Sequence, residues 1–158
     1  MDQQNDPDLL QEAQQELYLD PVSPGIRFAN FIIDRIIIFG IVIGIAFIWA
    51  AVSYSNGKAP DISLLTEESL RAKLLDYLIT AIITIIYYTV SEAATNGRTI
   101  GKMVTGTIAI KAEGGPFTFK DALLRSLCRV IPFEPFSALG ERPWHDTMTK
   151  TAVVKKVW

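Results

Sequence analysis

The chain has 158 residues, of which 49% are hydrophobic and 20% charged, and its formal net charge is −2. This length suits a single folded domain, and the one cysteine, Cys128, excludes an internal disulfide bond. The mean hydropathy of +0.26 is high for a soluble domain of this size, and the apolar residues are concentrated in two runs.

Residues 1–21 form an acidic segment that differs in composition from the rest of the chain. It carries six acidic residues and neither lysine nor arginine, the opposite of the basic start of a signal peptide, so we expect no cleavable signal. Within it, residues 6–19 predict a short amphipathic helix, with Asp6 as its cap and Pro7 at its first position. We treat residues 22–157 as the main domain.

Two long apolar runs predict two transmembrane helices. Residues 36–52 contain no charged residue, and neither do residues 77–91. A helix crosses a bilayer with about 17–25 residues. We therefore predict spans at about 27–52 and 74–94, an outer loop at 53–73 and a cytoplasmic portion at 95–158. The alternative, two buried core helices, would require more surrounding chain than this protein has.

The first predicted span contains charged residues near its start. Arg27 and Arg35 are long enough to extend toward the lipid headgroups, but the shorter Asp34 lies on the order of 10 Å into the membrane. A charge at the bilayer centre costs roughly 2.5–3.5 kcal/mol, and less near the interface, so Asp34 must be protonated, hydrated or paired. Arg27 and Asp34 share a helix face, and either Asn30 between them or a water molecule is able to bridge the two.

Gly40 and Gly44 form a GxxxG pattern within the first span. The pattern permits close approach of two helices, but it also arises often by chance in apolar sequences. It is therefore either a helix-packing face or an incidental feature. Two helices alone cannot enclose a path for a solute, so any transport would need an oligomer or a partner subunit.

The cytoplasmic portion predicts a β-hairpin followed by an amphipathic helix. Apolar side chains alternate with more polar ones over residues 103–112, as in a strand, and residues 113–115 (EGG) are typical of a turn. Thr118 is placed to cap a helix over residues 119–131, in which Asp121 lies in the first turn.

Two interpretations of the charges on the 119–131 helix remain open. Arg125 and Arg129 lie on one stripe of this helix, and Glu92 lies near the cytoplasmic end of the second span. In the first interpretation, the helix lies at the membrane interface with its arginines on lipid phosphates. In the second, an arginine turns toward Asp34 and Glu92 and forms a buried ionic cluster at the inner leaflet.

His145 is the only histidine of the sequence, and Asp146 follows it directly. With no third ligand and no nucleophile at a recognisable spacing, the two residues predict neither a metal site nor a catalytic triad, and we expect no cofactor and no enzymatic activity. We predict a structural hydrogen-bonded pair, in which Asp146 is also a candidate helix cap or partner of Arg125 or Arg129. Three lysines near the end fit attraction to anionic lipid better than nucleic-acid binding: Lys150, Lys155 and Lys156.

Four stretches carry a resemblance to a known family: RFANFIIDRIII (27–38), GRTIGKMVTG (97–106), LLRSLCRVIPF (123–133) and WHD (144–146). In this order, over about residues 22–155, they resemble the RDD family of bacterial integral membrane proteins, which is named for one arginine and two aspartates. The resemblance implies that Arg27 and Asp34 are the arginine and the first aspartate, and we take Asp146 as the second. It also implies transport of unidentified ligands, with cation/proton exchange suggested for some members.

The sequence thus predicts an α-helical membrane protein: a two-span transmembrane hairpin with a cytoplasmic β-hairpin and amphipathic helix. Ten lysines and arginines follow Gly97, which favours both termini in the cytoplasm of a bacterial plasma (inner) membrane protein. The first functional hypothesis is a small transporter or cation/proton exchange component that uses intramembrane carboxylates. The alternative is a non-transporting membrane scaffold or assembly subunit. Membrane lipids and a homo-oligomer or other membrane subunits are the expected partners.

Overall fold

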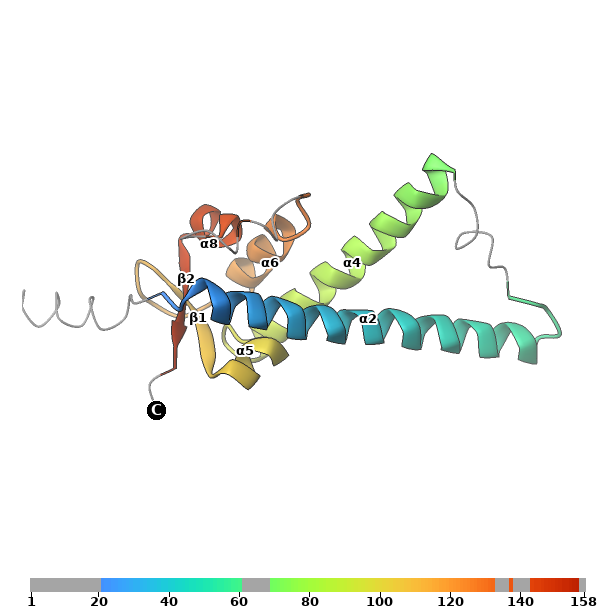
Figure 1. Ribbon diagram of the computed structural model, residues 1–158, viewed down its shortest axis with the longest axis horizontal. Coiled ribbons are helices and arrows are strands. Elements are labelled where there is room, and N and C mark those ends of the chain that lie inside the picture. Colours follow the sequence, from blue (N-terminus) through green and yellow to red (C-terminus); the bar gives the residue numbers. More distant parts are fainter. Residues whose placement is uncertain (1–20, 61–68, 133–136, 138–142, 157–158) are drawn as a thin grey trace, which may run out of the picture.

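The computed structural model describes residues 21–60, 69–132, 137 and 143–156. It is mostly helical, with two long helices that extend from a group of shorter elements at one end (Figure 1). We call this group the cap, and it consists of α5, β1, α6, α8 and β2. The helix predicted for residues 6–19 lies outside the described residues.

Helix α2, Pro24–Ser55, is the first candidate span and is longer than the predicted 27–52. A proline suits its first turn because an N–H there would have no intrahelical partner. The helix ends at Asn56, and Gly57 follows with a φ of +69°. Its 32 residues extend about 48 Å. This exceeds the roughly 30 Å of a bilayer's hydrocarbon core, so part of α2 must lie outside that core when it crosses a membrane.

Helix α4, Leu70–Ala94, is the second candidate span and begins before the predicted residue 74. Ser69 caps it, because its hydroxyl oxygen accepts a hydrogen bond from the N–H of Ala72 at 3.2 Å. Both long helices are apolar enough to cross a membrane, and only 6% and 22% of their most apolar stretches are buried. Core helices of soluble proteins are mostly buried, so this exposure fits surfaces that face lipid.

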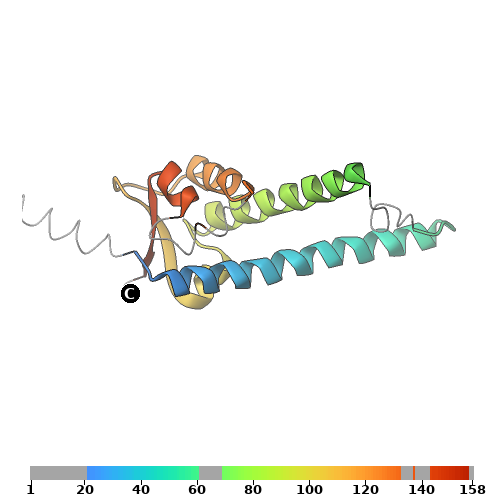
Figure 2. The same ribbon diagram turned by 45° about the horizontal axis from the view of Figure 1, so that its top comes forward.

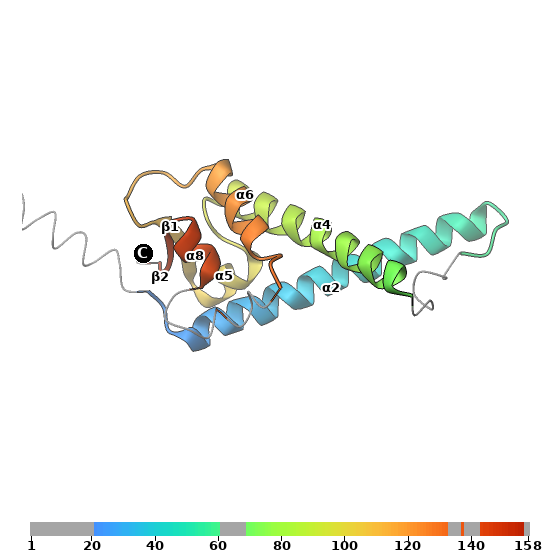
Figure 3. The same ribbon diagram turned by 90° about the horizontal axis from the view of Figure 1, so that it is seen from above.

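The two long helices diverge away from the cap in Figure 1 and cross in the view of Figure 3. Their apolar contact is centred on Ile38, Tyr87 and Tyr88, against which Ile37 and Ile83 are packed. The rings of Tyr87 and Tyr88 lie edge to face, with their centroids 5.2 Å apart. The connection between the spans is therefore concentrated at the cap end.

The single strand predicted for residues 103–112 is wrong in its first half. Helix α5, Ile100–Thr105, comes first, and strand β1, Thr107–Lys111, follows it. Thr99 caps α5, and Gly106 ends it with a φ of +68°, a conformation that glycine adopts without steric cost. A short alternating apolar pattern fits one helical turn as well as a strand, which is why the pattern alone misplaced the boundary.

The predicted β-hairpin is also wrong. Strand β1 pairs antiparallel with β2, Thr151–Lys155, which lies beyond α6 and α8 in the chain, and Thr107 is opposite Lys155. Alternation with a period of two identifies a strand but does not identify its partner. The N–H of Val22 donates to the carbonyl of Val153 at 3.0 Å, so the sheet also holds the start of α2.

Helix α6, Phe119–Cys128, begins at the predicted cap and ends before the predicted residue 131. The hydroxyl of Thr118 accepts the N–H of Asp121, whose carboxylate accepts the N–H of Thr118 in return. Helix α6 packs along α4, α5 packs against α2, and α8, Trp144–Met148, packs against α6 and β2 (Figure 2). Segments distant in sequence thus gather at one end of the long helices.

Candidate functional site

Glu92, near the end of α4, lies at the centre of the site. Its side chain is fully buried, and three cations surround its carboxylate. Lys102 Nζ lies 2.7 Å from Oε1 and Arg125 Nε lies 3.0 Å from Oε2, while Arg129 Nη2 lies 3.5 Å from Oε1. The structure therefore brings Glu92 together with both arginines of the amphipathic helix, and with a lysine of α5.

Arg125 connects Glu92 to the C-terminal part of the chain. Its side chain is fully buried, and its Nη1 donates to Asp146 Oδ1 and to Thr151 Oγ1. The Thr151 hydroxyl donates in turn to Asp146 Oδ1 at 3.1 Å. A planar guanidinium offers donors in several fixed directions, so one arginine holds α4, α6, α8 and β2 together.

We call Glu92, Lys102, Arg125, Arg129 and Asp146 the charge cluster. It holds three cations against two carboxylates, in a region that water barely reaches. Burial lowers the pKa of Lys102 to about 8, although the adjacent Glu92 carboxylate acts in the opposite direction. An interfacial position with the guanidinium on a lipid phosphate does not hold for Arg125, because its side chain reaches no solvent.

Asp34 has a separate set of partners, and all of them are neutral. Its Oδ1 accepts the hydroxyl of Tyr87 at 2.7 Å and the N–H of Gly101 at 2.8 Å, and its Oδ2 accepts the hydroxyl of Thr99 at 2.7 Å. No ion pair joins Asp34 to another of the described residues. The aspartate within the first span thus ties α2 to α4 and α5 by hydrogen bonds alone.

Glycine at position 101 is required by this contact. A Cβ there would lie 2.5 Å from the carbonyl oxygen of Asn30 and 3.0 Å from the carboxylate of Asp34. The first distance is shorter than real Cβ contacts, and a backbone atom of a long helix cannot move aside easily. Gly101 therefore lets α5 approach α2 closely enough for its N–H to reach Asp34.

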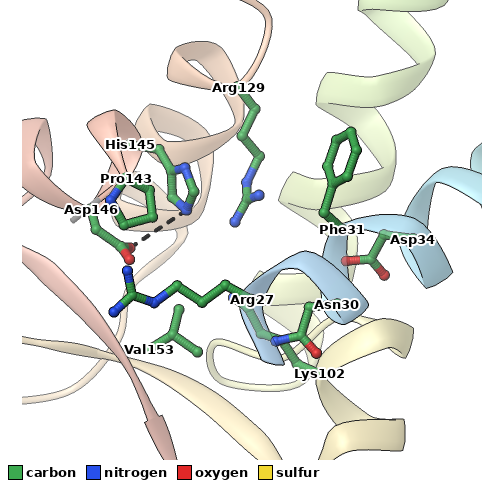
Figure 4. A pocket seen from close by; sticks show the side chains of 10 residues that line it. All are labelled: Arg27, Asn30, Phe31, Asp34, Lys102, Arg129, Pro143, His145, Asp146 and Val153. Carbon is green, nitrogen blue, oxygen red and sulfur yellow. Dashed lines mark ion pairs between the residues drawn. The ribbon is translucent and has the colours of Figure 1, made fainter. Parts of the chain in front are cut away.

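Asn30 does not bridge Arg27 and Asp34. Its Nδ2 donates to Thr107 Oγ1 at 3.0 Å, and its Oδ1 accepts the hydroxyl of Thr105. The amide therefore joins α2 to the end of α5 and the start of β1. Arg27 is buried and extends from α2 toward Asp146, away from Asp34 (Figure 4).

A small cavity lies between the first turns of α2 and the cap (Figure 4). Its volume of about 30 Å³ is enough for one or two water molecules. Arg27, Asp34 and Lys102 line it from one side, and His145 and Asp146 line it from α8. The cavity is therefore polar and bordered by charges of both signs.

His145 is not hydrogen-bonded to Asp146 as predicted, because its Nε2 lies 3.6 Å from Oδ1. Burial, together with the positive charges of Arg129 and Arg125, holds the pKa of His145 well below its usual range. The imidazole is therefore neutral at pH 7, and the position of Asp146 is set by Arg125 and Thr151.

The two glycines of the GxxxG pattern do not pack against any described part of the chain. A Cβ at Gly40 or at Gly44 would have no atom within 4 Å. Within one chain, this pattern therefore does not bring α2 and α4 together, and a packing role would require another molecule.

Several residues of the site escape sequence reasoning: Tyr87, Thr99, Gly101, Lys102 and Thr151. Hydroxyl residues are common in spans and caps, and nothing in their spacing reveals a distant carboxylate as partner. Lys102 had a detectable signal, because it lies three residues after a capping threonine in a run flanked by glycines. Residues 97–106 do not have the spacing of a phosphate-binding loop, so a buried structural role for Lys102 remained open.

The chemistry open to this arrangement is charge pairing and hydrogen bonding. Among the residues that the structure describes, no group of three or more His, Cys, Asp or Glu side chains is placed to hold a metal ion. The arrangement defines a class of protein: a small helical protein with two candidate membrane spans that buried charges tie to a cap.

The particular family follows from sequence comparison. A profile of the RDD family matches residues 21–154, most of the chain, and the chain therefore belongs to this family. The resemblance carried by the arginine and aspartate motifs is confirmed. Comparison with curated proteins gave no match, and neither did comparison with solved structures.

Proposed function

We propose that this RDD-family protein is a two-span membrane module that acts as an assembly subunit of a larger membrane complex, with the charge cluster locking its cap onto the spans. The candidate spans cross the bilayer as an antiparallel pair. Both termini lie in the cytoplasm of a bacterial plasma membrane, because most lysines and arginines follow the second span. The cap then lies at the inner face.

The two buried acids of the long helices, Asp34 and Glu92, are both fully engaged, and this observation carries the proposal. Both oxygens of Glu92 face cations within 3.5 Å, and both oxygens of Asp34 accept hydrogen bonds of 2.7–2.8 Å. A metal cation needs several oxygen ligands that are not already occupied. Carboxylates engaged in this way are suited to holding helices in place, since removing one partner of a buried pair costs about 3–5 kcal/mol.

The divergence of the spans supports a role in assembly. Beyond their contact at the cap end, α2 and α4 leave large apolar side chains exposed, including Phe47 and Trp49. Two diverging helices leave no enclosed path for a solute. A second copy or another membrane subunit is therefore the expected neighbour of the outer halves, with lipid filling the remainder.

A small transporter or cation/proton exchanger is the second candidate, and one observation favours it. Asp34 has only neutral partners, so protonation would break no ion pair. It also borders a polar cavity with room for water. In this mechanism Asp34 would accept and release a proton as the exchanged ion passes through an oligomer.

Flux measurements on the full chain in proteoliposomes separate the two candidates. We expect no proton flux coupled to sodium or potassium gradients, above the level of empty vesicles. Coupled flux that Asp34→Asn and Asp34→Ala abolish equally would overturn the assembly proposal in favour of exchange. The assembly proposal further expects Arg125→Met, but not the exposed Arg71→Met, to abolish co-purification of a tagged and an untagged copy or of other membrane subunits.

A further inference from the structure

A groove lies between α2 and α4, lined by residues of both helices and by the end of α6. It consists of two neighbouring cavities of about 180 Å³ and about 480 Å³, and Arg35 and Thr80 line both. The smaller cavity has a mixed lining, in which Arg129, Tyr77 and Thr84 supply polar groups beside apolar residues. The larger is mainly apolar, with Ile36, Phe39 and Val42 along α2. The groove thus has a cationic end and an apolar end.

Arg35 is the unexplained residue of this groove. Unlike the arginines of the charge cluster, it has no ion pair with any of the residues that the structure describes. It directly precedes the charge-free part of α2, residues 36–55. That stretch is about 30 Å long, which matches the hydrocarbon core of a bilayer. Arg35 therefore lies at the depth of the lipid headgroups of the inner leaflet.

Arg129 provides the second cation at the same end. Its guanidinium lies 4.3 Å from the centre of the Tyr88 ring, and its Nη2 lies 3.5 Å from the Glu92 carboxylate. Arginine donates in pairs to phosphate oxygens, and such charge-assisted hydrogen bonds are among the strong ones in proteins. Among the described residues, Asp76 is the only acid that lines either cavity, and it lines the larger one alone.

We propose that this groove binds one anionic phospholipid. Its phosphate lies between Arg35 and Arg129, and an acyl chain lies along Ile36, Phe39 and Val42. An anionic headgroup is favoured over a zwitterionic one, because a choline group would add a third positive charge beside the two guanidinium groups. The bound lipid would fill the angle between the diverging spans and compensate the charge of Arg35. The inference rests on the proposed crossing of the bilayer by α2 and α4, but not on the assembly role.

Native mass spectrometry of the delipidated full chain in detergent tests this site. We expect phosphatidylglycerol to bind as a single retained adduct and phosphatidylcholine to bind roughly tenfold more weakly, a difference of about 1.4 kcal/mol, because its choline group repels the two guanidinium groups. Arg35→Gln should remove this preference, whereas Arg71→Gln, an exposed arginine outside the groove, should keep it. Val42→Trp should weaken both lipids, because the indole would fill the apolar end.

Three results would overturn the lipid site: equal binding of the two lipids by the unaltered chain, an unchanged preference in Arg35→Gln, or displacement of phosphatidylglycerol by millimolar inorganic phosphate. Circular dichroism of each variant shows whether it is folded, and Val42→Trp tests the groove without changing charge. A separate measurement tests whether α2 and α4 cross the membrane at all. If they do not, an alkaline carbonate wash releases the chain from membranes. Failure of the assembly role leaves lipid binding unchanged.

Discussion

The two ends of the long helices are built in opposite ways. At the cap end, most of the side chains that α2 and α4 bury are polar or charged, among them Asn30, Asp34 and Glu92. Toward the other end, large apolar side chains are exposed, such as Phe47 at 73% and Ile48 at 68%. A soluble protein shows the reverse distribution. At the cap end, the chain itself therefore supplies the partners of the buried side chains. The other end requires an apolar environment.

This difference indicates where the attraction between the spans originates. Lipid tails are as apolar as leucine side chains, so the outer halves gain little from contact with each other in a bilayer. The hydrogen bonds and ion pairs of the cap remain, and they connect both helices to the same small group of elements. Substitutions in the cap should therefore affect stability strongly, and matched substitutions in the outer halves should not.

The largest effect is expected for Arg125→Met. It leaves the Asp146 carboxylate without its guanidinium and removes one of three cations from Glu92, and breaking a buried ion pair costs about 3–5 kcal/mol. Denaturant unfolding in detergent micelles, followed by circular dichroism, measures the loss. Arg71→Met, at an exposed position on α4, is the control. Equal unfolding midpoints for the two variants would show that the cluster does not hold the cap.

A smaller loss is expected at Asp34, and its size depends on the replacement. Asp34→Ala leaves three buried donors without an acceptor, so we expect about 3 kcal/mol of destabilisation in the same assay. Asp34→Asn keeps one oxygen for Tyr87 and Gly101 and should cost about 1 kcal/mol. The exposed Asp76→Asn should change nothing. If alanine and asparagine are equally harmful, the negative charge matters more than the hydrogen bonds.

A pair of glycine substitutions compares the two ends directly. Gly101→Ala places a methyl group 2.5 Å from a backbone oxygen of α2, and forcing apart a packed site costs about 1–3 kcal/mol. Gly40→Ala places the same methyl group where no atom lies within 4 Å, so it should be neutral or slightly stabilising for the single chain. Thermal unfolding of both variants in detergent makes the comparison. A strong effect of Gly40→Ala on cross-linked oligomers alone would identify that face as a contact between copies.

The two long apolar helices and the burial of Asp34 follow from the sequence because both rest on large energies. A charge-free run of bilayer length predicts a span, and an aspartate near its start must be protonated, hydrated or paired. The cap of α6 at Thr118 is similarly local, because its two hydrogen bonds lie within four residues. A feature is therefore predictable from the sequence when it depends on residues close in the chain, or on a large energetic cost such as that of an unpaired charge.

The identities of the partners are not predictable in the same way. Asp34 is held by hydroxyls and one backbone N–H rather than by an arginine, and the sequence contains many equivalent hydroxyls. The partner of β1 is likewise chosen by the tertiary arrangement, since any alternating segment offers the same backbone groups. Both depend on the assembled cap, in which Arg125 joins Glu92 of α4 to Asp146 of α8.

The smallest expected effect concerns pH and the neutral His145 of the cap. Its folded pKa lies below the unfolded value of about 6.5, because of burial and the nearby arginines. Below that pH, the unfolded chain binds a proton that the folded chain does not, so stability should fall by about 1 kcal/mol between pH 6.5 and 5.5 and show no such loss above it. His145→Gln should reduce this slope, whatever its effect at pH 7.5, when both proteins are unfolded in denaturant across the range. Parallel slopes would mean that the cap accommodates an imidazolium, and its interior would then be more hydrated than the burial of this side chain indicates.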